Sequence, residues 1–275
     1  MKLPESMEEE INRWALPDWD STSNWCKKRN NHSIRCTIDI LGENVKTEMD
    51  AKHSLEEHKT CLNRFRTENL KASLAVKLSA LGANVNQFLC EKNLHEILKK
   101  AQENHVIIEI DIEGTPLVDF TIETAIKCVK EEIPIPLALQ AYLDRTPEDL
   151  KRVLSHGITV RLVKGAYKGD TDDFFLIQKK FRELFNMLLE SDSDFLIGTH
   201  DPELIEWVKE RTRDNKEKIE FGFLKGLADK TKLSLVEQGW QVSEYVPFGS
   251  ERKAYETRRR RYLLELEKLK REPAP

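Results

Sequence analysis

Residues 106–163 contain three short apolar runs, VIIEIDI (106–112), PLALQAY (136–142) and TVRLV (159–163), with gaps of helical length between them. Runs rich in β-branched residues are typical of strands, and gaps of this length allow crossover helices between parallel strands. Five further runs continue the pattern, at residues 34–41, 72–78, 195–199, 219–224 and 241–246. The sequence therefore predicts eight parallel strands that alternate with helices.

Eight strands in alternation favour an α/β fold, a closed (β/α)8 TIM barrel, and 275 residues suit a barrel of about 250 residues. An open doubly wound sheet is the alternative that the pattern alone leaves open. Between the runs, residues 49–69 and 85–102 mix apolar and charged residues as amphipathic helices do. Thr146 before Pro147 predicts a helix capped by Thr146, and Asp201 before Pro202 predicts a second start of the same kind.

Two segments lie outside the barrel pattern. Residues 1–30 contain three tryptophans and are predicted to form an N-terminal helical extension, and residues 31–275 are predicted to form the catalytic barrel domain. Within the extension, residues 7–16 are amphipathic, so they either pack on the protein or contact a membrane surface. Residues 251–271 are rich in charges at helical spacing, which predicts a final helix.

Composition excludes several classes of protein. The chain has 44 Lys and Arg against 48 Asp and Glu, a net charge of -4, which excludes a strongly basic protein that binds nucleic acid mainly through phosphates. No apolar stretch approaches the roughly 18 residues of a membrane span. The N-terminus shows no secretory signal, and the five cysteines are scattered without a CxxC pair. We therefore predict reduced thiols, no metal site and a cytoplasmic location.

Polar side chains stand at the carboxyl ends of the predicted strands, which form one mouth in a (β/α)8 barrel. These residues are Lys77, Asp111, Glu113, Gln140, Tyr142, Arg161, Lys164, His200 and Tyr245. A charge inside an apolar strand is costly unless it is paired or used. One interpretation is that Lys77 and Asp111 form a structural ion pair, and the other is that the whole set forms a functional site.

The predicted mouth has more cations than anions, which favours an anionic ligand such as a carboxylate or a phosphate. Gly165 and Ala166 follow Lys164 and let backbone amides approach a phosphate closely. No GxGxxG or GxxxxGK[ST] motif occurs, which disfavours a Rossmann or P-loop site. Four arginines occupy residues 258–261 of the final helix, and at most two of them can face one pocket. A solvated basic face is the plain alternative for this run.

With these residues assembled, the sequence resembles the proline dehydrogenase family, FAD-dependent enzymes with a distorted (β/α)8 barrel. The stretch VRLVKGAY (160–167) carries the resemblance most strongly. Seven further matches follow the order of the family between about residues 41 and 261: LGE (41–43), VKLSALG (76–82), DIE (111–113), LQAYLDR (139–145), THDPEL (199–204), YVPFG (245–249) and YxxRR (255–259). Eight matches in sequence order are specific, although each short one alone is weak.

The resemblance implies a role for each matched position. Substrate would be bound by Lys77, Asp111, Tyr245, Tyr255, Arg258 and Arg259. The two arginines would hold the substrate carboxylate, which suits guanidinium geometry. Arg161 would lie near the flavin N5 atom and act in catalysis with Lys77 and Asp111. The other cofactor contacts would be Ile112, Gln140, Lys164, Gly165, Ala166, Thr199 and His200.

The activity that this resemblance implies is the oxidation of L-proline to 1-pyrroline-5-carboxylate by hydride transfer from proline C5 to FAD N5, the first step of proline catabolism. The substrate amine should react in its neutral form, so activity should rise with pH. By the same resemblance a quinone or another acceptor takes the electrons, which implies peripheral contact at the inner membrane face.

Three positions depart from the family pattern. Tyr262 stands where many members have a glutamate, Gly222 where many have a glutamine, and Lys168 where the long bifunctional members have a tryptophan. Two alternatives therefore stay open. One is a Schiff-base aldolase or lyase that uses Lys77 or Lys164 with a pKa depressed by burial. The other is a flavin-binding homologue without catalytic activity.

Overall fold

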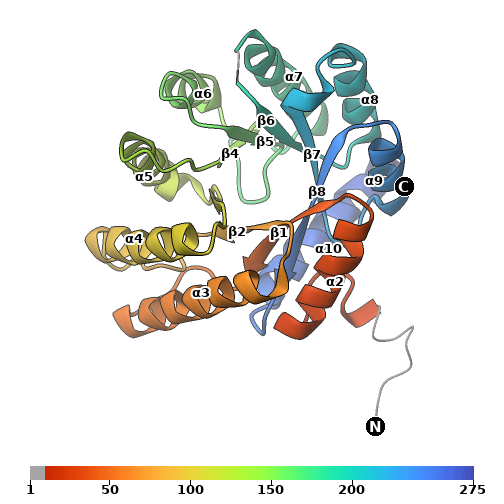
Figure 1. Ribbon diagram of the computed structural model, residues 1–275. Helices are drawn as coiled ribbons and strands as arrows, with labels where there is room; N and C mark the ends of the chain where they lie inside the picture. The colour runs from red at the N-terminus through yellow and green to blue at the C-terminus, as the bar shows by residue number, and fades with distance from the viewer. Residues whose placement is uncertain (1–9, 192) are drawn as a thin grey trace.

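The computed structural model describes residues 10–191 and 193–275, and its strands form a closed barrel in the order β1 to β8 (Figure 1). All neighbouring strands are parallel, and β8 pairs with β1 from Ser243–Arg35 to Phe248–Ile40. The strands are β1 (Arg35–Ile40), β2 (Ala72–Val76), β3 (Ile108–Ile110), β4 (Leu137–Gln140), β5 (Val160–Val163), β6 (Phe195–Gly198), β7 (Ile219–Leu224) and β8 (Gln241–Phe248). The predicted barrel is thus confirmed, and the open sheet is excluded.

Helices surround the strands on the outside of the barrel (Figure 1). They are α3 (Glu48–Glu68), α4 (Gln87–Glu103), α5 (Val118–Lys130), α6 (Thr146–Leu154), α7 (Phe174–Glu190), α8 (Pro202–Arg211) and α9 (Asp229–Glu237), with the short turns η1 (Thr115–Leu117) and η2 (Lys216–Lys218). Asp201 caps α8 as predicted, because its carboxylate accepts from the Glu203 and Leu204 amides. The predicted Thr146 cap is wrong. Thr146 is the first residue of α6, and its buried hydroxyl donates to the Gln140 carbonyl of β4 at 2.5 Å.

The first and last helices depart from the regular barrel arrangement, in which the helix after β8 covers β8 and β1. Here α2 (Trp19–Asn31) packs there instead, and both Trp25 and Arg29 contact Glu244 of β8. The final helix, α10 (Lys253–Lys268), is therefore free to lie over the carboxyl ends of the strands, where Arg258 pairs with Glu43 beyond β1. This exchange places residues of the last helix in the mouth of the barrel.

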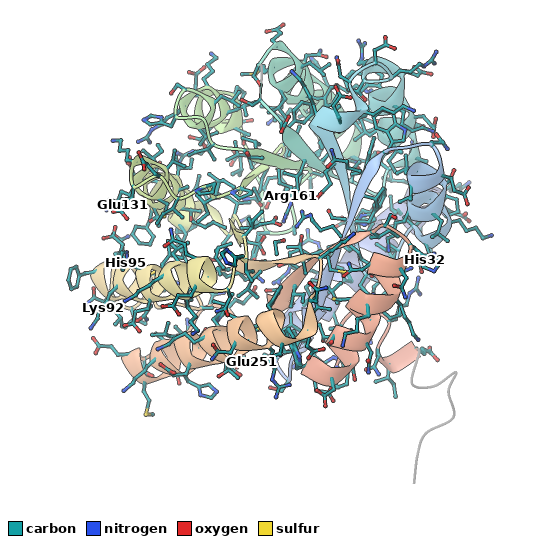
Figure 2. The ribbon with its side chains drawn as sticks, viewed as in Figure 1. His32, Lys92, His95, Glu131, Arg161 and Glu251 are labelled. Atoms are coloured by element: carbon teal, nitrogen blue, oxygen red, sulfur yellow. The ribbon has the colours of Figure 1, made fainter. Side chains whose placement is uncertain are left out.

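The apolar core lies between the strands and the outer helices, where Leu74, Leu162 and Phe185 are fully buried. The inside of the barrel is instead lined by charged side chains, and Arg161 lies within the ring of strands, whereas Lys92 lies on the periphery (Figure 2). Buried charges of this kind persist only when they are paired or serve a function.

The N-terminal segment before α2 is fastened to the barrel. Residues 14–16 are buried, and Leu16 forms a bridge with Phe248. Arg252 donates to the carbonyls of Ile11 and Ala15, and Lys225 donates to that of Asn12. These contacts favour the packing interpretation over membrane contact for residues 10–16, whereas residues 7–9 of that prediction lie outside the described part of the chain.

Two findings bear on the compositional predictions. None of the helices in the described ranges combines the length and the apolar character that crossing a bilayer requires. The five cysteines are buried free thiols, as predicted.

Glu68 links α2 to α3 and gives a testable dependence of stability on pH. It accepts from Trp19 Nε1 at 2.7 Å and from the Ser23 hydroxyl, and it pairs with Lys27 at 2.7 Å. Burial alone raises the pKa of Glu68, but the bonds from Lys27, Ser23 and Trp19 outweigh it and lower the pKa to about 2. A depressed pKa adds stability above the unfolded value of about 4.3 that is lost as pH falls through the folded value.

We expect Glu68→Gln to lower the free energy of unfolding by about 1–2 kcal/mol at neutral pH, because hydrogen bonds to a charged acceptor are lost. At about pH 2 the difference from the wild type should shrink, since about half of the wild-type carboxylate is then protonated in the folded state. Urea melts at both pH values measure this, with the exposed Glu57→Gln of α3 as control. An equal effect of Glu68→Gln at both pH values would contradict the assignment.

Candidate active site

Lys77, directly after β2, is the centre of a polar group in the mouth of the barrel. Its Nζ lies 2.5 Å from Asp39 Oδ1 and 3.5 Å from Asp111 Oδ2. Tyr245 of β8 lies beside it, with its hydroxyl 3.2 Å from Lys77 Nζ, and donates to Asp111 at 2.5 Å. The predicted pairing of Lys77 with Asp111 is therefore present, but Asp39 of β1 is the nearer partner.

These two carboxylates decide the protonation state of Lys77. Burial lowers the pKa of Lys77, yet Asp39 and Asp111 together outweigh burial and raise it above its ordinary value. The expectation that burial would depress this pKa is wrong, because the lysine is desolvated next to two acids. Lys77 thus stays charged, which removes it as a Schiff-base nucleophile.

Arg161 of β5 points into the barrel interior. Its Nη2 contacts Glu109 of β3, and its Nη1 lies 3.7 Å from Asp111, which directly follows β3, so two acids flank one guanidinium. Burial and then the nearby Arg35 lower the pKa of Arg161 to about 10, which still leaves it a cation at neutral pH. The sequence analysis predicted Asp111 as a member of this site but did not predict Glu109.

Arg258 of α10 is held by Glu43, which follows β1. The guanidinium donates twice to the carboxylate, at 2.7 and 2.9 Å, and the Tyr167 hydroxyl donates to the same group at 3.0 Å. Burial raises the pKa of Glu43, but Arg258 and Tyr167 outweigh it and lower the pKa. Glu43 belongs to the quoted LGE stretch, although no role was predicted for it. This pair joins the last helix to the first strand across the mouth.

Arg259 differs from its neighbour because it makes no hydrogen bond or ion pair with any residue that the structure describes. It is only 9% exposed, and its guanidinium lies 5.1 Å from the Tyr255 ring. The Tyr255 hydroxyl is also buried without a partner among the described residues. Two buried donors on one face of α10 therefore lack an acceptor, and buried polar groups without partners are rare.

Most of the predicted cofactor residues lie on or directly after three neighbouring strands, β4, β5 and β6, and Ile112 follows β3. Gln140 Nε2 donates to the Glu113 carbonyl at 2.9 Å, and Lys164 pairs with Asp201 at 2.7 Å. His200 Nε2 accepts from the Leu224 amide at 2.9 Å. Burial and then the charge of Arg259 hold the pKa of His200 well below its usual value, so the imidazole is neutral.

Gly165 and Ala166 follow Lys164 in a tight loop, where Gly165 has a φ of +130°. A Cβ at Gly165 would lie 1.9 Å from Cε1 of Tyr142, so the ring of Tyr142 occupies the space that any side chain would need. Thr199 accepts from the Asp201 amide at 3.2 Å, and Ile112 is buried just beyond β3. Glycine is therefore required at position 165 for packing against the Tyr142 ring. The sequence had suggested another reason, the close approach of backbone amides to a phosphate.

The predicted excess of cations in the mouth is wrong. The structure adds three carboxylates at the mouth that the sequence interpretation did not place there, Asp39, Glu43 and Asp201, and a fourth, Glu109, deeper in the barrel. Two of them carried the same signal as Asp111, a single acid between isoleucines, in Ile38-Asp39-Ile40 and Ile108-Glu109-Ile110. Glu113, which was predicted at the rim, accepts from the Ser79 amide and hydroxyl and so supports a loop.

Comparison with known proteins places this arrangement in a family. The family model described as proline dehydrogenase matches residues 23–172, which is more than half of the chain. The chain belongs to the proline dehydrogenase family. Proline dehydrogenase 1 of Bacillus subtilis subsp. natto is 29% identical over 240 residues, 85% of this chain and 80% of that protein. Proline dehydrogenase of Deinococcus radiodurans is 26% identical over 244 residues, 82% of this chain and 77% of that protein.

Solved structures show the same barrel. Proline utilization A from Bdellovibrio bacteriovorus, inactivated by N-propargylglycine, superimposes with a TM-score of 0.82 at 19% identity and covers 92% of this chain. The same protein from Corynebacterium freiburgense gives 0.81 at 17% identity and covers 95%. This chain spans about a third of the length of those proteins, 33% and 32%. At these identities the likeness concerns the fold.

Tyr262 occupies the position where the resemblance led us to expect a glutamate. Its ring lies 6.1 Å from the ring of His200, and burial raises the pKa of its hydroxyl. A neutral phenol at this position does not supply the charge that a glutamate would. Asp39, Glu43 and Asp111 are acids that do lie near the substrate-binding group of the mouth.

Proposed function

We propose that this protein is a proline dehydrogenase that oxidises L-proline to 1-pyrroline-5-carboxylate with bound FAD. One observation carries the proposal beyond family membership: Arg259 is a buried guanidinium without a carboxylate partner among the described residues. An uncompensated buried charge is costly, so such a group is typical of a binding site for an anion. The carboxylate of a small amino acid fits this requirement.

Several side chains would position such a substrate next to Arg259. The Tyr255 hydroxyl offers a second unpartnered donor on the same helix. Tyr245 is held in place because it donates to Asp111, and its hydroxyl lies 3.2 Å from Lys77 Nζ. A fixed ring at this position would pack against the apolar part of a cyclic substrate, and such positioning is a large share of catalysis.

The residues on and after β4, β5 and β6 have the chemical groups that a flavin nucleotide requires. Lys164 and Arg161 supply positive charge for phosphates and for an electron-rich ring, Gln140 supplies an amide, and the neutral His200 keeps a free ring nitrogen. Ile112, Gly165, Ala166 and Thr199 would complete that contact surface. Bound FAD would supply the acceptor for the two electrons and the hydrogen that leave C5 of proline.

In this proposal, side chains of the protein bind and orient the substrate and the cofactor, and they balance the charges that develop. Lys77 stays protonated between Asp39 and Asp111, so it does not accept the proton of the substrate amine. The amine should therefore enter in its neutral form, which keeps the prediction that activity rises with pH. Arg161 keeps its charge in the barrel interior and would stabilise negative charge that develops above it.

The absorption spectrum of the purified protein tests the proposed function. We expect a flavin spectrum, after reconstitution with FAD where the protein is purified without it, and loss of the visible bands when L-proline is added without oxygen. The expected product is trapped as the adduct of 1-pyrroline-5-carboxylate with o-aminobenzaldehyde. Bound flavin that stays oxidised in excess L-proline would instead support the homologue without catalytic activity.

A Schiff-base enzyme is retained as a second candidate only for Lys164. Burial lowers the pKa of Lys164, although Asp201 opposes that shift through a 2.7 Å ion pair. Borohydride trapping of a carbonyl compound on Lys164 in a colourless protein would favour this function over proline oxidation.

We further propose that a quinone or another acceptor takes the electrons, and that the protein acts in the cytoplasm, peripheral at the inner membrane face. Family resemblance supports this part of the proposal.

A further inference from the structure

Charged side chains alternate in sign along the inside of the barrel. We name the following set the axial charge row: Glu220, Arg35, Glu109, Arg161, Asp111, Lys77 and Asp39. It begins at the amino ends of the strands, where β1 and β7 start, and ends in the mouth at the carboxyl ends of β1 and β2. The row therefore connects the two ends of the barrel through direct contacts between charged groups.

Arg35 and Glu109 make close contacts at the amino end of the row. Arg35 donates twice to Glu220, at 2.6 and 2.9 Å, and its Nη1 lies 3.0 Å from Glu109 Oε1. The other carboxylate oxygen of Glu109 contacts Arg161. On its other side, Arg161 lies farther from its acidic neighbour, with 3.7 Å between Nη1 and Asp111 Oδ1. Arg161 is thus held mainly from the amino end and only loosely from the mouth.

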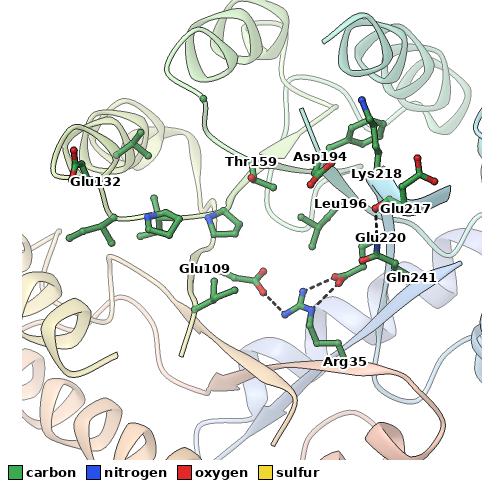
Figure 3. Close-up of a pocket in the computed structure, with 18 residues that line it drawn as sticks. Arg35, Glu109, Glu132, Thr159, Asp194, Leu196, Glu217, Lys218, Glu220 and Gln241 are labelled. Carbon is green, nitrogen blue, oxygen red and sulfur yellow. Dashed lines mark hydrogen bonds and ion pairs between the residues drawn. The ribbon is translucent and has the colours of Figure 1, made fainter. Parts of the chain in front are cut away.

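A cavity of about 660 Å³ opens at this amino end, on the opposite side of the barrel from the candidate active site. Figure 3 shows Arg35 in this cavity between Glu109 and Glu220, with Asp194 and Glu217 nearby. The side chain of Arg35 is 28% exposed, whereas that of Glu109 is only 3% exposed. Solvent therefore reaches the outer end of the axial charge row, and Glu109 separates that end from Arg161.

Glu109 compensates two cations at once. Without its charge, Arg35 and Arg161 would face each other unscreened in a buried interior, where like charges repel strongly. Among the described residues, Asp111 would then be the one acid left within ion-pair distance of Arg161, and the repulsion would drive Arg161 toward the mouth. Because Asp111 also accepts from Tyr245 and lies 3.5 Å from Lys77, such a movement would disturb the group that we assign to substrate binding.

We propose that Glu109 is a positioning residue that holds Arg161, and that Arg35 fixes Glu109 from the amino-end cavity. No sequence motif assigned a role to either residue. The inference rests on the proposed function, since it explains how Arg161 is kept at one depth in the barrel while substrate and flavin bind above it. It predicts that substitutions at the amino end of the barrel alter the active site by displacing the guanidinium of Arg161.

Glu109→Gln tests the first contact with little change in shape. We expect kcat for L-proline to fall by about tenfold or more, since misplacing a catalytic group by about 1 Å can cost about a hundredfold. The dissociation constant of FAD, measured by fluorescence titration, should change by at least about threefold, a readout that needs no turnover. Glu217→Gln removes an exposed acid from the same cavity and should leave both values within about twofold of the wild type.

Chemical rescue tests the role of Arg35. Arg35→Ala should reduce kcat in the same way as Glu109→Gln, and the cavity should admit guanidinium ion to the vacated position. Millimolar guanidinium should restore most of the lost kcat and FAD affinity in Arg35→Ala but not in Glu109→Gln. Urea, which has the same shape without the charge, should restore neither. Thermal melts show whether each variant is folded at the assay temperature.

The outcomes separate this inference from the proposed function. If the wild type binds FAD but does not oxidise L-proline, the proposed function fails, and the FAD titrations of the variants still test the positioning role. If the wild type is active and folded Glu109→Gln matches it in kcat and FAD affinity, the positioning role is overturned. Equal rescue of Arg35→Ala by guanidinium and urea would overturn the role of the Arg35 charge.

Discussion

Replacing Arg259 with methionine should lower kcat/KM for L-proline by about a hundredfold or more. Removing one partner of a buried charge pair costs about 2–5 kcal/mol, and about 2.7 kcal/mol corresponds to a hundredfold. Arg259→Lys should recover only part of the loss, since an ammonium group cannot form two parallel bonds to a carboxylate. Steady-state kinetics with L-proline measure these changes.

The flanking arginine provides a matched control. Arg260 is the next residue on α10 and is exposed, so Arg260→Met should leave kcat/KM within about twofold of the wild type. The free energy of unfolding also distinguishes a binding role of Arg259 from a structural role. Arg259 has no ion pair with the described residues, so Arg259→Met should not lower the free energy of unfolding, in contrast to the loss of a structural residue. Equal kinetic losses in Arg259→Met and Arg260→Met would refute the assignment of Arg259 as the carboxylate site.

The second large effect is expected at Lys77. Lys77→Met leaves Asp39 and Asp111 buried without their cation, and breaking a buried pair in this way costs about 3–5 kcal/mol of folding free energy. Turnover of L-proline should be lost as well, because Tyr245 and Asp111 lose the charge that organises them. Urea melts and steady-state kinetics measure the two effects.

A double variant separates stability from function at this position. Lys77→Met combined with Asp39→Asn removes one of the two uncompensated acids, so much of the lost stability should return. Activity should not return, since the substrate pocket still lacks its lysine. Lys92→Met on the exposed face of α4 is the control for loss of a lysine and should change neither quantity. If the double variant regains activity together with stability, the role of Lys77 is structural only.

Local sequence patterns predicted most of the fold because each strand and helix has a short-range cause. Runs such as VRLV and IEFGFL form strands, and the Asp201 carboxylate caps α8 through the amides that follow it. The Thr146 cap is absent because the Thr146 hydroxyl instead donates to the Gln140 carbonyl at the end of β4, the strand that precedes α6. Local pattern predicts a helix start well, but a tertiary contact can redirect the capping side chain.

The site residues divide in a similar way. The sequence located Lys77, Asp111, Arg161 and Tyr245 because charges and a tyrosine at strand ends stand out against apolar neighbours. It overlooked Asp39 and Glu109, which carry the same pattern, since a strand does not reveal which acid faces which base. Consequently the net charge of the mouth was mispredicted, although most of its members were identified.

By itself the sequence determined the alternation of eight strands with helices, the family, and the residue types that line one end of the barrel. Only the tertiary structure decided that Arg258 is neutralised by Glu43 while Arg259 has no ion-pair partner among the described residues, and that α2 replaces the last helix beside β1 and β8. The physical reason is that hydrophobic periodicity is a local property of the chain. The pairing of charges depends instead on which strand and helix ends meet in space, and that is fixed only when the barrel closes.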